Sequence, residues 1–148
     1  MIEIILSNET EEELKENYES IINIAINKVG EIMELKGDWE VSVSIVNPEE
    51  IRMLNSEYRE VDEITDVLSF PLDFDVDVPM KMLGDIVINL EKIKSQALEF
   101  NHSKERELSY LTVHSMLHLL GFDHIDEEDR VEMRKKENEI MEELGILR

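Results

Sequence analysis

Residues 103–124 read SKERELSYLTVHSMLHLLGFDH, a helical stretch that ends at a glycine. Its last eleven positions hold three of the four histidines in the chain: His114, His118 and His124. Residues four apart lie on one face of a helix, so the first two imidazoles should point the same way. Gly121 should end the helix, because glycine adopts the left-handed backbone without steric cost. The chain can then fold back and bring His124 to the same place.

Three imidazoles at this spacing predict a metal site. A set of three His ligands leaves a fourth position for water, which is the arrangement of a catalytic zinc centre. Imidazole suits zinc and nickel alike, so we expect one Zn²⁺ per chain and leave nickel open. The fourth histidine, His102, precedes a helix start and is expected to be a solvent-exposed turn residue rather than a ligand.

The same spacing matches the zinc-peptidase pattern H-E-x-x-H-x-x-G-x-x-H at all positions but one. Ser115 stands where those peptidases carry the glutamate that takes the proton from zinc-bound water. A serine cannot do this near neutral pH, and a general base contributes roughly 10²- to 10⁴-fold in rate. The substitution therefore disfavours peptide hydrolysis.

Composition narrows the class of protein. The chain has 148 residues and no cysteine, which excludes a disulfide scaffold, a thiol nucleophile, an iron–sulfur cluster and a cysteine-ligated zinc finger. This length predicts a single domain over residues 1–148. Lys and Arg number 15 against 36 Asp and Glu, a net charge of −21, which argues against a general polyanion binder. At 42% hydrophobic residues the chain can still build a core.

Targeting signals are not evident in the sequence. No run approaches the roughly 20 apolar residues of a membrane span. The first residues, Met1–Leu6, lack the basic flank and the small-residue cleavage site of a signal peptide. We therefore expect a cytoplasmic protein without membrane contact.

The hydrophobic pattern predicts an α+β fold, or α/β layer, in which a small mixed β-sheet is flanked by helices. Thr10 with Glu13 resembles a capping box at the start of the first long helix. Residues 73–79 alternate but are heavily acidic, which indicates an edge strand or an exposed hairpin arm. Strands are predicted at 2–6, 39–46, 67–72 and 83–90, and helices at 11–35, after Asn47-Pro48, and at 90–100, 103–120 and 127–144.

A second notable stretch, residues 54–71, reads LNSEYREVDEITDVLSFP. It places Arg59 at the end of a helix, ahead of an acidic loop and a strand. An arginine there interacts favourably with the helix dipole, so by itself it is more simply structural. Likewise, Thr65-Asp66 by itself fits turn chemistry before a strand.

The two stretches together resemble the YbeY family of bacterial rRNA maturation factors, which are single-strand-specific metallo-endoribonucleases. The family motif H-G-x-L-H-L-L-G-Y-D-H corresponds to residues 114–124, and L-N-x-x-[FY]-R-x-x-D-x-x-T-D-V-L-S-F-P corresponds to residues 54–71. A third motif, L-G-D-I-x-I, appears at residues 83–88. All three occur in the family's order, so the resemblance covers essentially the whole chain.

The resemblance implies a metal held by His114, His118 and His124, and a catalytic Arg59. It also implies a fold similar to a trimmed zinc metalloprotease. The implied activity is metal-dependent cleavage of single-stranded RNA in maturation of the small-subunit rRNA 3′ end and in ribosome quality control. Single-stranded rRNA and the ribosome or its small-subunit proteins are the implied partners, and no DNA is expected.

The sequence departs from the family pattern at several positions. Ser115 replaces a glycine and adds a hydroxyl near the metal, and Phe122 replaces a tyrosine and removes one. Glu60 and Val61 stand where a Gly-Lys pair is common, and Ile64 stands where proline is common. Losing that lysine removes one possible phosphate contact beside Arg59.

The expected chemistry is hydrolysis of a phosphodiester by metal-activated water, with the Arg59 fork on the scissile phosphate. Asp66, Asp85 and Asp123 are the candidates to orient the ligand imidazoles, and the sequence does not choose among them. Two alternatives stay open. One is a zinc peptidase or amidase with an unrecognised base, and the other is a non-catalytic ribosome-assembly module with a structural metal.

Overall fold

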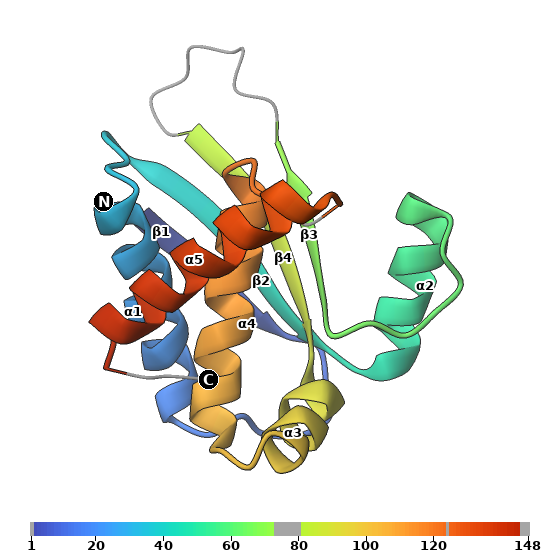
Figure 1. Cartoon of the computed structure of the whole chain (residues 1–148). Helices are drawn as coiled ribbons and strands as arrows, with labels where there is room; N and C mark the ends of the chain where they lie inside the picture. The colour runs from blue at the N-terminus through green and yellow to red at the C-terminus, as the bar shows by residue number, and fades with distance from the viewer. Residues whose placement is uncertain (1, 73–80, 124, 146–148) are drawn as a thin grey trace.

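The computed structural model describes residues 2–72, 81–123 and 125–145, with backbone only at residue 81, and its framework is a four-stranded sheet (Figure 1). The strand order is β1-β2-β4-β3. The first three are mutually parallel, whereas β3 runs antiparallel to β4. The strands are β1 (Ile2–Asn8), β2 (Trp39–Val46), β3 (Val67–Pro71) and β4 (Lys81–Asn89).

Helices cover both faces of this sheet. The larger core lies between the sheet and a layer formed by α1, α4 and α5, and a smaller cluster on the other face joins α2 to the strands. Figure 1 shows α4 behind α5 and in front of the sheet. The helices are α1 (Asn17–Ile32), α2 (Pro48–Arg59), α3 (Leu90–Glu99), α4 (Lys104–Leu119) and α5 (Glu127–Glu143). The α+β fold with a small mixed sheet is confirmed.

The strand β2 shows why the pattern predicts the sheet so well. Val41, Val43 and Ile45 are fully buried, whereas the serines between them are half-buried. Successive side chains of a strand point to opposite faces, so the alternating apolar residues fill the main core. The parallel β1–β2 pair requires a crossover, which α1 supplies.

The central helix α4 is buried on most of its circumference, and ten of its residues are buried. It packs against α1, α3, α5, β3 and β4. A helix enclosed in this way belongs to the core. Ser103 begins it as predicted, its Oγ accepting the backbone N–H of Arg106 at 3.1 Å. Side chains on α4 are therefore held on a rigid support.

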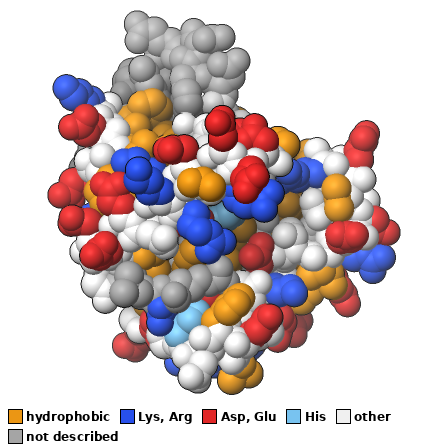
Figure 2. Space-filling view, viewed as in Figure 1, with side chains coloured by type: hydrophobic (Ala, Val, Ile, Leu, Met, Phe, Trp, Pro, Cys, Tyr) orange, Lys and Arg blue, Asp and Glu red, His pale blue; other side chains and the backbone are white. Residues whose placement is uncertain are grey.

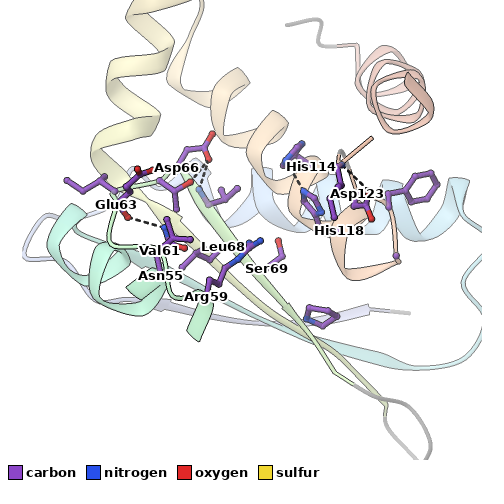
Figure 3. A pocket seen from close by; sticks show the side chains of 17 residues that line it. Asn55, Arg59, Val61, Glu63, Asp66, Leu68, Ser69, His114, His118 and Asp123 are labelled. Atoms are coloured by element: carbon purple, nitrogen blue, oxygen red, sulfur yellow. Dashed lines mark hydrogen bonds between the residues drawn. The ribbon is translucent and has the colours of Figure 1, made fainter. Parts of the chain in front are cut away.

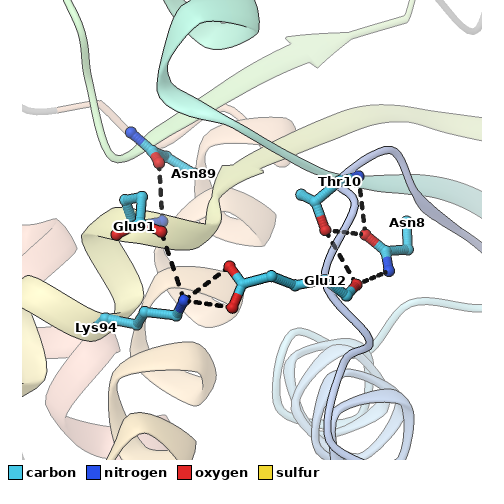
Figure 4. Close-up of polar contacts among 6 residues, drawn as sticks. All are labelled: Asn8, Thr10, Glu12, Asn89, Glu91 and Lys94. Atoms are coloured by element: carbon cyan, nitrogen blue, oxygen red, sulfur yellow. Dashed lines mark hydrogen bonds and ion pairs between the residues drawn. The ribbon is translucent and has the colours of Figure 1, made fainter.

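The start of α1 differs from the prediction, because the helix begins at Asn17 instead of residue 11. Thr10 does not cap it: its hydroxyl donates to Oδ1 of Asn8 at 2.7 Å, and Nδ2 of Asn8 donates to the carbonyl of Glu12 at 2.8 Å. The Glu12 carboxylate also pairs with Lys94 of α3 at 2.7 Å (Figure 4). These contacts hold residues 8–12 in a turn. If the helix began at residue 11, they would be lost.

Most other predicted boundaries agree with the structure to within one or two residues. The predicted acidic strand at 73–79 lies outside the described residues. None of the described helices is long and apolar enough to cross a membrane.

Candidate metal centre

The two histidines of α4 converge as their spacing predicts. Their Nε2 atoms lie 3.2 Å apart, with ring centroids 4.7 Å apart and the rings nearly perpendicular (Figure 3). Both line the same cleft. The helix therefore presents two ring nitrogens, from His114 and His118, at one point.

A buried carboxylate on α5 fixes the orientation of the first ring. Nδ1 of His114 hydrogen-bonds Oε2 of Glu137, and the hydroxyl of Tyr110 donates to the other oxygen of that carboxylate at 3.2 Å. Glu137 is only 3% exposed. A carboxylate acceptor at this position favours the tautomer that has the proton on Nδ1. The lone pair of Nε2 is then left facing His118, as metal binding requires.

Glu137 was not among the residues proposed from sequence to orient the ligands. The three that were proposed make no hydrogen bond to an imidazole among the described residues. Asp66 accepts the N–H of Val67, Asp123 accepts the N–H of Ile125, and Asp85 does not line the cleft. A signal for Glu137 was nevertheless present in the sequence. It lies between buried Met133 and Ile140 on the apolar face of α5, where an unpaired carboxylate would be costly.

The donor set fits a zinc or nickel ion at the two described histidines. Two nitrogens bound to one tetrahedral zinc lie about 3.3 Å apart, close to the observed 3.2 Å. Neutral imidazoles with a carboxylate behind one of them are also typical of such sites. Across the described residues, no group of three or more His, Asp or Glu side chains is placed to hold a metal. His124 lies outside the described residues, so the third ligand stays a prediction.

Gly121 ends the histidine helix as predicted. Its φ of 100° lies in the left-handed region that favours glycine. Its N–H bonds the carbonyl of His118 at 3.1 Å, and the N–H of Phe122 bonds that of Leu117 at 3.0 Å. These bonds satisfy carbonyls that the helix leaves open. The turn leads the chain back over the helix end, where Asp123 lines the cleft.

The cleft in front of the histidines has a volume of about 570 Å³ and brings the two sequence motifs together. One wall carries His114, His118 and Asp123. The opposite wall comes from α2, β3 and the loop between them, and it includes Arg59. Figure 3 shows the Arg59 side chain extending over β3 toward Ser69, on the side of the histidines. No described carboxylate forms an ion pair with Arg59.

The loop after α2 is fastened to its surroundings, which positions Arg59. Nδ2 of buried Asn55 donates to the carbonyl of Glu63 at 3.0 Å. The Arg52 guanidinium donates two hydrogen bonds to the Asp62 carboxylate, of 2.8 and 3.3 Å. This contact holds the pKa of the Asp62 carboxyl below its usual value. Asn89 of β4 donates to the carbonyl of Thr65 at 3.1 Å. Together these bonds tie the loop to α2 and to the sheet.

The residue after Arg59 is one of the departures from the family motif, and its backbone shows why the motif often has glycine there. Glu60 ends α2 in the left-handed conformation, with a φ of 58°. This backbone favours glycine, which is the residue that the family motif often carries there. This chain adopts the same left-handed turn with a glutamate.

Two expectations about single side chains were wrong. The His102 side chain is 4% exposed, not solvent-exposed: it stacks on Phe100, and its Nε2 lies 3.1 Å from the buried Glu107 carboxylate. Ser115 does not bring its hydroxyl to the cleft. It is fully buried, and its Oγ has no hydrogen-bond partner among the described residues.

Comparison with known proteins identifies the family. Residues 5–145 match the family model described as "Endoribonuclease YbeY". This chain belongs to the YbeY endoribonuclease family. It is similar to Endoribonuclease YbeY of Finegoldia magna, with 50% identity over 92% of this chain and 86% of the relative. It is 48% identical to Endoribonuclease YbeY of Clostridioides difficile, over 95% of this chain and 92% of that one.

A solved structure supports the same fold. The chain is similar to the solution structure of TM1509 from Thermotoga maritima, with a TM-score of 0.58 and 30% sequence identity. The similarity covers 96% of this chain and 91% of that protein.

Proposed function

We propose that this chain is a metal-dependent endoribonuclease that hydrolyses single-stranded rRNA at the cleft between α4 and the α2–β3 loop. The observation that carries the proposal is the placement on one cleft of two converging imidazole nitrogens and of Arg59, which has no ion pair among the described residues. In this proposal His114, His118 and His124 would hold one Zn²⁺ or nickel ion. Arg59, across the cleft, would bind the phosphodiester.

The residues of the chain divide the chemistry between them. When bound, the cation supplies a water that ionises near neutral pH and a positive charge for the phosphate. Glu137 holds the His114 ring in the tautomer that can bind it. Arg59 offers a planar fork of N–H donors that fits two phosphate oxygens. It would hold the substrate and stabilise negative charge that accumulates during the reaction.

Phosphodiester cleavage accounts for the site better than peptide cleavage does. A zinc peptidase needs a proton-accepting side chain at position 115, and Ser115 is buried away from the cleft. An ion that served only as structural support would have no need of an open cleft with an arginine on its opposite wall. The position of Arg59 on that wall therefore supports catalysis over a purely structural metal.

Within the cell, the proposed role is maturation of the small-subunit rRNA 3′ end and ribosome quality control, carried out in the cytoplasm by residues 1–148 as one domain. The net charge of −21 supports a requirement for help in binding RNA. Docking on the ribosome or its small-subunit proteins would supply it. No DNA or membrane partner is part of the proposal.

The test combines metal analysis with cleavage of single-stranded and double-stranded RNA. Wild type should bind one equivalent of zinc or nickel and cut only the single strand. Folded His114→Ala, purified in parallel, should lose both properties, which also controls for contaminating nuclease. Near-normal cleavage by that variant, or faster cleavage of casein than of RNA, would contradict the proposal.

A further inference from the structure

A second cavity, of about 360 Å³, lies on the α5 side of the metal centre. Its lining includes His114, which also lines the cleft of Arg59, so the metal-binding ring lies between the two cavities. The remaining lining residues come from α4 and α5 and are Tyr110, Arg130, Met133, Arg134 and Glu137.

Two arginines flank this cavity on one face of α5. Arg130 and Arg134 are four residues apart, so their side chains project in the same direction. Both are exposed, whereas Met133 beside them is 2% exposed and belongs to the core. Figure 2 shows blue side chains gathered around a pale blue histidine at the centre of this face.

Neither guanidinium is neutralised within the described part of the chain. Neither Arg130 nor Arg134 has an ion pair there, although the chain carries 36 Asp and Glu residues. The buried carboxylate of Glu137 in the same cavity is bonded to His114 and Tyr110 instead. Two arginines on one helix face that have no ion pair in the described part of the chain offer a local site for an anion.

We propose that Arg130 and Arg134 bind a backbone phosphate of the RNA chain next to the one that is cut. This inference rests on the proposed function, because it takes the scissile phosphate to lie at the histidines. A strand crossing the metal centre would then meet Arg59 on one side and the α5 arginines on the other. Guanidinium groups match phosphate oxygens in geometry and are weakly hydrated, which suits them to this contact.

The pair would act through binding rather than through the chemical step. Arg130→Gln/Arg134→Gln should weaken binding of a fluorescein-labelled 12-nucleotide oligouridine about tenfold at low salt. Each phosphate contact adds about 0.7 to the slope of log affinity against log salt for a single strand, so loss of this one phosphate contact should make the slope shallower by about 0.7. Arg134→Lys, which keeps the charge, should retain most of the affinity.

Lys135→Gln is the matched control. It removes one positive charge from an exposed neighbour on α5 that does not line the cavity, and it should leave both affinity and salt slope near wild type. Bis(p-nitrophenyl) phosphate, a diester without a flanking phosphate, separates binding from chemistry. The double variant should hydrolyse it as fast as wild type does.

The test is the fluorescence anisotropy of the labelled oligouridine as metal-loaded protein is added, with a gel to confirm that the oligonucleotide stays intact. Equal affinity and slope in the double variant and Lys135→Gln, or no binding by wild type, would overturn the inference. An equal loss on the small diester would also overturn it, because the arginines would then act on the metal centre through Glu137. If wild type binds the oligonucleotide but never cuts RNA, the proposed function is wrong. The affinities of the double variant and Lys135→Gln would still show whether the two arginines bind the RNA backbone.

Discussion

The Nε2 atoms of His114 and His118 lie 3.2 Å apart on consecutive turns of α4, a helix that is buried on most of its sides. The protein itself holds the two rings in this arrangement, because the core fixes the helix and Glu137 fixes one ring. A preformed pair loses little conformational entropy when a metal binds, which favours tight binding.

Zinc should therefore stabilise the folded protein. A ligand at one hundred times its Kd adds about 2.7 kcal/mol to the free energy of unfolding, or roughly 5 to 10 °C in Tm for a chain of this size. We expect this rise in thermal unfolding of wild type when zinc replaces EDTA. His118→Ala should show almost none of it. Calcium, which prefers oxygen ligands, is the control ion.

Glu137→Gln tests whether the carboxylate on α5 orients His114. The amide keeps the size of the side chain but loses the charge that favours a protonated Nδ1. Loss of such a partner costs about 10- to 100-fold in metal affinity, which competition with a chromogenic chelator would measure. Glu132→Gln removes an exposed carboxylate from the same helix and should change nothing. Equal affinities in the two variants would assign Glu137 a purely structural part.

The sequence predicts the features that depend on local geometry. The four-residue spacing of His114 and His118 places both rings on one face, and Gly121 ends their helix because it must adopt a left-handed backbone. Alternation in β2 likewise predicts which of its side chains enter the core. In each case the determining interaction lies within a few residues along the chain.

What the sequence does not predict depends on contacts between distant segments. Glu137 meets His114 only because α5 packs on α4, 23 residues further along the chain. His102 is buried because Glu107 and Phe100 enclose it, although its neighbours look like a loop. Thr10 fails as a cap because Asn8 binds its hydroxyl first. Local patterns contain no information about which partner wins such a competition.

Gly84 should be intolerant of any side chain. A Cβ there would lie 2.4 Å from the carbonyl oxygen of Phe70 and 2.9 Å from Cδ2 of Leu119, and its φ is 147°. Gly84→Ala should therefore cost about 3 kcal/mol or more in free energy of unfolding, from overpacking and backbone strain together. At Gly37, with a φ of 90°, an added Cβ would meet no described atom within 4 Å beyond the adjoining residues, so Gly37→Ala should cost only the strain of about 1 to 2 kcal/mol. Urea unfolding would compare the free energies of unfolding of the two variants. Equal losses of stability would show that the neighbouring atoms move to make room for a Cβ at position 84.

The Arg52–Asp62 pair should make the α2–β3 loop sensitive to acid. The guanidinium lowers the pKa of Asp62 in the folded protein, so its stabilising effect is present above the ordinary pKa near 4 and is lost as pH falls through the lowered value. Arg52→Gln should raise the pKa of Asp62 back toward its ordinary value and speed amide exchange in the loop at neutral pH. An NMR titration of the carboxyl checks the first effect. An unchanged pKa of Asp62 in Arg52→Gln would show that the two hydrogen bonds between Arg52 and Asp62 do not persist in solution.

Arg59→Gln should impair catalysis without disturbing metal binding. Removing one donor that stabilises developing charge typically costs about 10²- to 10³-fold in rate, and Arg59 is placed to supply two such donors. We expect a fall of at least 100-fold in kcat/KM on single-stranded RNA, with unchanged zinc content and Tm. Arg59→Lys should recover only part of the activity, because an ammonium keeps the charge but lacks the planar fork. Arg52→Gln removes an arginine from the same helix that lines a different cavity and acts only by fastening the loop, so its loss of activity should be far smaller than that of Arg59→Gln. If Arg59→Gln and Arg52→Gln lose activity equally, the effect comes from the loop they share and Arg59 does not touch the phosphate.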